Sequence, residues 1–144
     1  MTEHQIVTAP ELAPPSGYAH AVVPAGTDLV FLGGQTALDA GNRIVGETLV
    51  EQFRQAASNL AAAMRAAGCE GEDLISLQVF CTDIDEYRSS LAELAPVWRE
   101  HFGRRYPAVG LFGVTRLFDV EAKIELMGVA ARRGEAASSR AARE

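Results

Sequence analysis

The stretch that most constrains the fold runs from Arg105 to Ala131, where two apolar segments of strand length flank a polar turn near residues 119–122. This pattern predicts a β-hairpin. Neither segment alternates cleanly between apolar and polar residues, since Val109 would face one side of the sheet and Phe112 the other. A strand that is apolar on both faces is usually buried on both faces, so we expect both faces of this hairpin to be covered.

Glycines and one carboxylate interrupt these apolar segments. The glycines, which weaken a strand and often mark the close approach of a ligand or of another backbone, are Gly110, Gly113 and Gly128. Glu125 is the charge within the second segment, and a carboxylate there needs a partner, a raised pKa or a function. Two interpretations stay open: an ion pair with Arg116 or Lys123, and a role in chemistry.

Other elements can be predicted before this hairpin. Residues 18–23 and 28–33 predict a first hairpin, with its turn at 24–27. Thr48 and Glu51 have the spacing of a capping box, which opens a helix expected over Leu49–Ala67. Gly68 is expected to end that helix.

A strand and a second helix follow. Residues 74–82 alternate like a strand that is buried on one face. Residues 87–102 have helical periodicity, with a kink expected at Pro96 or a new helix beginning near Glu93. Two helices against one mixed sheet predict an α/β or α+β fold with both helices on one face. The other face would remain apolar and uncovered, which indicates oligomerisation.

Length and composition narrow the function classes. The 144 residues predict one domain over residues 1–133, followed by a disordered tail over 134–144. A net charge of −6 argues against broad binding of nucleic acid. The sequence has no apolar run of membrane-spanning length and no signal pattern, so we expect a cytoplasmic protein. Cys69 and Cys81 make neither a disulfide framework nor a metal cluster, and we expect no metal or cofactor.

Few residues suggest chemistry by themselves. Gly33 and Gly34 end a predicted strand, where free backbone amides can bind an anion, although tight turns use the same residues. Asp83 follows a strand as a helix cap would, and Cys81 alternates into an apolar face as a core residue would. His101 lies near a helix C-terminus, where a cation is favourable.

Over about residues 16–132 the chain resembles the RidA/YjgF family. The matching pieces stand in the order of the family: Tyr18, residues 31–39, residues 55–68, residues 79–83, Pro107-Ala108, residues 114–117 and residues 123–125. The resemblance implies an α+β, chorismate-mutase-like fold, with a mixed six-stranded sheet and two helices packed on one face. It also implies a homotrimer with small-molecule clefts between subunits, and the hydrolysis of reactive enamines and imines.

The resemblance also implies the site residues. Glu125 would be catalytic, and the substrate-binding residues would be Tyr18, Gly33, Gly34, Thr82, Val109 and Leu111. Deaminating members carry an arginine two residues after the proline that matches Pro107, and this chain has Val109 there. Such an arginine holds the substrate carboxylate with two hydrogen bonds.

Three further pocket positions depart from the family pattern. Leu111 replaces a cysteine, Gly33 replaces a serine, and Leu91 or Ala92 replaces an asparagine. Of the usual polar set, only Tyr18 and Glu125 remain.

Several functions stay open. The first is a divergent hydrolase for C=N bonds in a substrate without the usual carboxylate. The second is a non-catalytic, small-molecule-binding or regulatory trimer. An endoribonuclease or translation inhibitor is the least favoured, because the chain is acidic. Arg104, Arg105 or Arg116 could replace the missing arginine from another direction.

Overall fold

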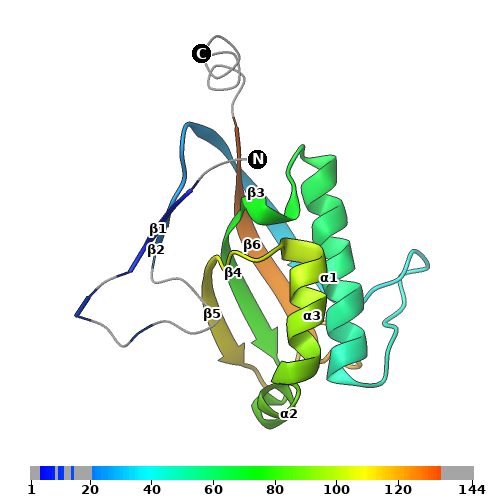
Figure 1. Ribbon diagram of the computed structural model, residues 1–144. Helices are drawn as coiled ribbons and strands as arrows, with labels where there is room; N and C mark the ends of the chain where they lie inside the picture. Colours follow the sequence, from blue (N-terminus) through cyan, green and yellow to red (C-terminus); the bar gives the residue numbers. More distant parts are fainter. Residues whose placement is uncertain (1–3, 9, 12–13, 15–20, 134–144) are drawn as a thin grey trace.

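The computed structural model describes residues 4–8, 10–11, 14 and 21–133. Along the chain come β1 (Gln5–Val7), β2 (Ala21–Val23), β3 (Thr27–Gln35), α1 (Leu49–Ala66), a 3-10 turn η1 (Gly71–Asp73), β4 (Leu74–Cys81), α2 (Ile84–Ser89), α3 (Leu91–Phe102), β5 (Ala108–Gly113) and β6 (Ile124–Arg133) (Figure 1). Tyr18 and the expected tail over 134–144 lie outside the described residues. None of the described helices is long and apolar enough to cross a membrane.

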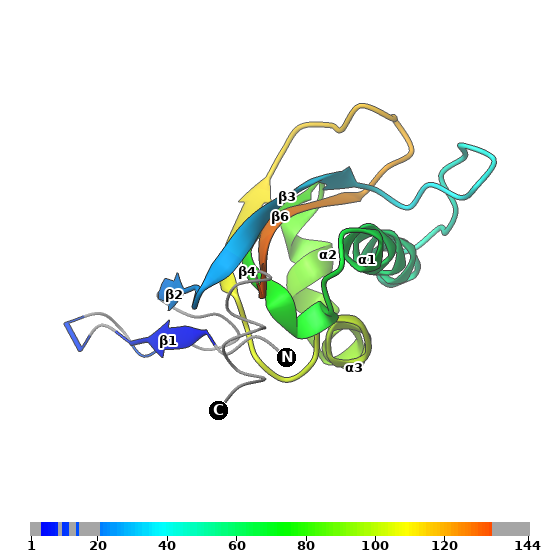
Figure 2. The ribbon, with the colours of Figure 1, turned by 90° about the horizontal axis from the view of Figure 1, so that it is seen from above.

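A mixed sheet and two helices form the body of the protein. The sheet has the strand order β3-β6-β4-β5, with β4 and β5 parallel and the other neighbours antiparallel. Both α1 and α3 cover the same sheet face, and β1 and β2 pair with each other beside it (Figures 1 and 2). The α+β fold with its helices on one face is confirmed, and the six described strands divide into sheets of four and two.

Both predicted hairpins are wrong. β4 lies between β5 and β6, so the two segments of the expected closing hairpin are not neighbours. β5 is instead an edge strand parallel to β4, and α2 and α3 make the crossover that a parallel pair requires. β2 pairs with β1 and not with β3. The apolar pattern of β5 therefore predicted neither its partner nor its burial, since none of its residues is buried in the single chain.

The helices differ less from expectation. The capping box of Thr48 and Glu51 is present, and Gly68, with φ of 80°, follows the end of α1. The second helical segment breaks at Ser90, where α2 ends and α3 begins, and Pro96 lies inside α3. Asp83 caps α2 by accepting a hydrogen bond from the Glu86 amide at 3.0 Å.

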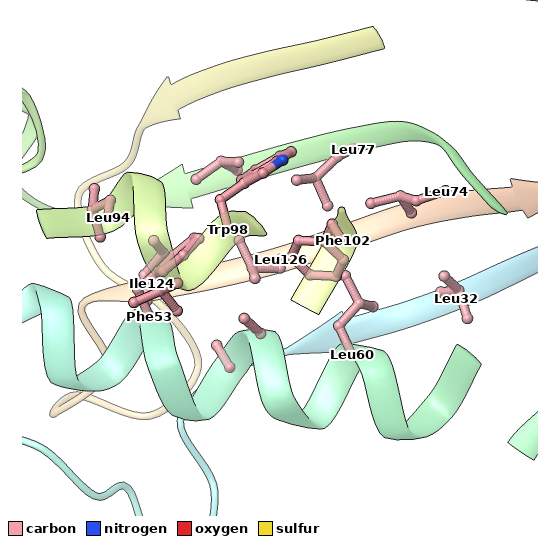
Figure 3. Close-up of a cluster of buried hydrophobic side chains, with 14 of the residues drawn as sticks. Leu32, Phe53, Leu60, Leu74, Leu77, Leu94, Trp98, Phe102, Ile124 and Leu126 are labelled. Atoms are coloured by element: carbon pink, nitrogen blue, oxygen red, sulfur yellow. The ribbon is translucent and has the colours of Figure 1, made fainter. Parts of the chain in front are cut away.

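The core lies between the helices and the sheet. Large buried side chains from α1, α3, β4 and β6 interlock there, including Phe53, Leu60, Leu77, Trp98, Phe102, Ile124 and Leu126 (Figure 3). The other sheet face carries exposed apolar side chains, namely Leu29, Phe31, Phe112 and Met127. Both faces of the closing segment were expected to be covered. Within one chain the helices cover one face of β6, and no residue of β5 is buried.

Gly128→Val is expected to destabilise the protein by about 1–3 kcal/mol, the cost of overpacking a core. A Cβ at Gly128 would lie 2.6 Å from the Ser76 carbonyl oxygen and 3.0 Å from Leu74 Cδ1. Gly110→Val should cost less, because the Cβ would meet the ring of Phe112, which is 47% exposed and can turn away. Urea unfolding measures both, and equal losses would contradict this placement of Gly128.

Candidate functional site

Glu125 projects from β6 onto the sheet face that the helices leave open. Its neighbours Ile124 and Leu126 are completely buried under the helices, so the alternation of the strand directs Glu125 to the other side. It stands opposite Phe80 of β4 and is half-buried. A carboxylate therefore lies on a face that also carries Phe80, Met127 and the polar side chain of Gln78.

The ion pairs expected for Glu125 do not form in the described part of the chain. Lys123 forms an ion pair with Glu86 instead, and its Nζ lies 3.1 Å from Glu86 Oε2. Arg116 is exposed and donates from Nε to the carbonyl oxygen of Leu117 at 3.4 Å. The carboxylate of Glu125 is therefore left available to a ligand or to a second chain.

Gly33 and Gly34 form a β-bulge next to this carboxylate. β3 and β6 pair regularly as far as Leu32 and again at Gln35. The two glycines between them stand opposite the single residue Met127, which is the pattern of a bulge. Bulges interrupt the ladder of hydrogen bonds and often lie beside active sites.

Because Gly34 has no side chain, it leaves the space that the carboxylate of Glu125 occupies. A Cβ built on Gly34 would collide with Glu125 Oε1, whereas one built on Gly33 would meet nothing within 4 Å. Neither glycine has a positive φ, so the requirement at Gly34 comes from space and not from backbone conformation. The structure thus brings together three of the residues that the family resemblance implied, since Gly33 and Gly34 form the bulge beside Glu125. We call Glu125, Gly33 and Gly34 the carboxylate half-site.

Gln52 holds the segment that leads into Glu125, and sequence reasoning missed it. This side chain is 2% exposed. Its Nε2 donates to the carbonyl oxygens of Gly46 at 3.1 Å and Glu121 at 3.0 Å. Its Oε1 accepts a hydrogen bond from the Lys123 amide at 2.8 Å. The start of β6 is therefore fixed to α1.

A signal for Gln52 was present in the sequence. It stands between Leu49 and Phe53 on the apolar face of α1, where a polar side chain must find internal partners. Thr82 also binds the segment before β6 through its backbone, because its amide donates a hydrogen bond to the carbonyl oxygen of Lys123 at 3.0 Å. Thr82 is otherwise exposed at the end of β4.

Val109 lines a cavity of about 270 Å³ on the opposite side of the sheet. Four aromatic residues contribute to its walls: Phe53, Tyr87, Trp98 and Tyr106. The aliphatic lining residues are Leu91, Leu94, Ala95 and Val109. We call this space the aromatic cavity. None of the described residues that line it carries a formal charge at neutral pH, and burial raises the pKa of the Tyr87 phenol above its ordinary value.

The cavity unites two of the departures from the family pattern. Val109 stands where the family has an arginine, and Leu91 is one of the two positions, with Ala92, that match the asparagine; Val109 and Leu91 line the same space, and Ala92 does not. Leu111 lies on the same face of β5 as Val109 but is not part of the lining, and it is partly exposed.

The arginines that could have replaced the missing one lie elsewhere. Arg104, Arg105 and Arg116 are all exposed, and none of them is among the residues that line the cavity. Cys81 is buried in the core, where burial raises the pKa of its thiol, so it is poorly suited to act as a nucleophile. Among the described residues, no group of three or more His, Cys, Asp or Glu side chains could hold a metal ion.

Within one chain, the predicted site residues do not all lie together. Val109 faces the helices, whereas Glu125 and Gly34 lie on the open face of the same sheet. Tyr18 lies outside the described residues. The residues thus form two separate groups that a single chain cannot direct at one small molecule.

The chain is similar to several known proteins. The family described as "Endoribonuclease L-PSP" matches residues 8–132. The chain is 33% identical to a RutC family protein of Synechocystis over 90% of this chain and 98% of that one. It is 32% identical to the 2-iminobutanoate/2-iminopropanoate deaminase of Salmonella typhimurium over 73% of this chain and 80% of that one.

Solved structures agree with these sequence matches. A conserved Rid family protein of unknown function from Yersinia pestis superimposes with a TM-score of 0.79 at 26% identity, covering 90% of this chain and 98% of that one. The YjgF gene product of E. coli gives a TM-score of 0.66 at 28% identity, covering 87% and 94%. The match over residues 8–132 and the shared fold establish that this chain belongs to the RidA/YjgF family, the family described as endoribonuclease L-PSP.

Proposed function

We propose that this protein is a cytoplasmic RidA-type hydrolase that acts on the C=N bond of an uncharged imine, including the imine tautomer of an enamine. The observation that carries the proposal is the aromatic cavity: Val109, which matches the position of the family's carboxylate-binding arginine, lines it, and no lining residue in the described part of the chain is charged. The relative from Salmonella is named for the deamination of 2-imino acids, and the reaction type is taken from it. We propose a different substrate class from that of this relative, because a carboxylate that leaves water for an uncharged cavity gains no interaction to replace its lost hydration.

The proposed reaction consumes one water molecule. The carboxylate of Glu125 accepts a proton as the water oxygen bonds to the imine carbon, and the proton then passes to the nitrogen. As the C–N bond of the tetrahedral product breaks, its hydroxyl proton passes to the nitrogen, which releases ammonia and leaves a carbonyl group. Backbone amides at the Gly33–Gly34 bulge and the hydroxyl of Thr82 would position the substrate.

The complete site would form between copies of the chain, in a homotrimer. The open sheet face carries exposed Leu29, Phe31 and Met127 around the carboxylate half-site, and a face of this kind is stabilised by contact with another protein surface. A neighbouring copy that covers this face could bring its aromatic cavity toward Glu125. Light scattering at micromolar concentration should give three times the chain mass, and a monomer would contradict the proposal.

Glu125→Gln tests the chemistry. This variant should hydrolyse a neutral imine about 10²–10⁴-fold more slowly than the wild type, the usual contribution of a positioned general base. Glu121→Gln, which removes an exposed carboxylate from the preceding loop, is the matched control and should retain activity. Wild-type protein that binds the neutral compound without turning it over would instead support the alternative, a non-catalytic small-molecule-binding trimer.

A further inference from the structure

The aromatic side chains that line the cavity pack against one another. Trp98 stacks on Phe53 with a centroid distance of 6.5 Å and an interplanar angle of 12°. Trp98 also meets Phe102 edge-on at 5.2 Å and lies against Tyr106 at 5.5 Å. Because Phe53 and Trp98 are buried, they form the floor, whereas Leu91 and Tyr106 are 55% and 36% exposed and mark the mouth.

The volume of the cavity sets the size of a suitable ligand. An engineered apolar protein cavity of about 150 Å³ is large enough to hold benzene. The space here is about 270 Å³, so it has room for one ring with a small substituent or for a fused pair of rings. Short aliphatic groups would leave much of it unfilled.

We infer that the aromatic cavity binds a neutral aromatic ring of the substrate, with the ring on Trp98 and the reacting group toward the mouth between Leu91 and Tyr106. Aromatic walls gain from offset-stacked and edge-to-face contacts with another ring, beyond the area that the contact buries. The walls offer no cation to a carboxylate, so the ring should be uncharged. This inference rests on the proposed function and names its substrate class.

Binding to the cavity can be measured without any turnover. Trp98 is the only tryptophan of the chain, so emission excited at 295 nm, at the red edge of indole absorption, reports the cavity alone. The probes are benzamide and benzoate, which match in shape and differ in charge. For the full-length protein we expect a saturable change in emission with benzamide, and binding of benzoate at least tenfold weaker.

Two alanines of α3 provide a matched pair of variants. Ala95 lines the cavity, whereas Ala92 is exposed and is not part of the lining. Ala95→Leu should therefore weaken benzamide binding at least tenfold, and Ala92→Leu should leave it unchanged. Calorimetry repeats the measurement, so that a change in emission is not mistaken for a change in binding.

The outcomes separate this inference from the proposed function. Absence of saturable benzamide binding, equal binding of benzoate, or unchanged binding in Ala95→Leu would each overturn the inference. The first of these would result if a side chain of a neighbouring copy fills the cavity. Hydrolysis of small aliphatic neutral imines without benzamide binding would leave the proposed function intact. Benzamide binding without hydrolysis of any neutral imine would overturn the proposed function alone.

Discussion

2-Aminoacrylate should be hydrolysed about 10²–10⁴-fold more slowly by this protein than by arginine-bearing relatives. Its carboxylate must leave water to enter the site, and an arginine restores that solvation through two charge-assisted hydrogen bonds, each worth roughly 1.5–3 kcal/mol. Val109 restores none of it, and the rest of the cavity lining is uncharged. A loss of about 3–5 kcal/mol corresponds to that range of rates. A nearby ionised Glu125 would add repulsion.

Val109→Arg should bring measurable activity toward this substrate, because the cavity of about 270 Å³ has room for the longer side chain. The assay couples a reaction that generates 2-aminoacrylate to detection of the keto acid. Leu111→Arg is the matched control, since Leu111 shares the face of β5 with Val109 but lies outside the cavity lining. Wild-type turnover equal to that of arginine-bearing relatives would reject the argument, and equal gains in both variants would show a nonspecific effect of charge.

Gly34→Ala should reduce hydrolysis of a neutral imine about 10²-fold while leaving the fold intact, whereas Gly33→Ala should have little effect. The new methyl group at position 34 would collide with Glu125 Oε1, and the one at position 33 would meet nothing within 4 Å. The obstructing atom is the end of a flexible side chain, so the carboxylate moves while the strand stays in place. A displaced general base loses most of its contribution of 10²–10⁴-fold.

Kinetics and unfolding together distinguish this displacement from simple damage. Both glycine variants should unfold within about 1 kcal/mol of the wild type, the scale of Gly-to-Ala changes at unstrained positions. Gly34→Ala should give a lower kcat, and adding it to Glu125→Gln should produce little further loss. Full activity in Gly34→Ala would mean that the carboxylate of Glu125 does not act from the position it occupies in the structure.

Local signals in the sequence were sufficient for part of the fold. The capping box at Thr48 and Glu51, and the alternation through β4, identified those elements because neighbouring residues determine them. These local signals did not show which strands pair with each other. β5 has the apolar pattern of a buried strand, yet it lies at the sheet edge, with β4 between it and β6.

Less of the candidate site than of the fold could be predicted from the sequence. Glu125 stood out as a charge in an apolar segment, and the resemblance led to Val109. The cavity could not be predicted from the sequence, because Phe53, Trp98 and Tyr106 have the pattern of ordinary core residues. Whether such side chains fill a space or leave one depends on how α3 packs against β5, and residue spacing does not determine this.

The opposite orientation of Val109 and Glu125 affects how defective copies would behave in a cell. In a closed ring of the proposed kind, each chain would contribute to two different sites, the cavity to one and the carboxylate to the next. A copy with one defect would silence one site, and two copies with different defects could together rebuild a working one. A copy with both defects would inactivate two of the three sites, so in mixed trimers it would remove more activity than its share of the chains.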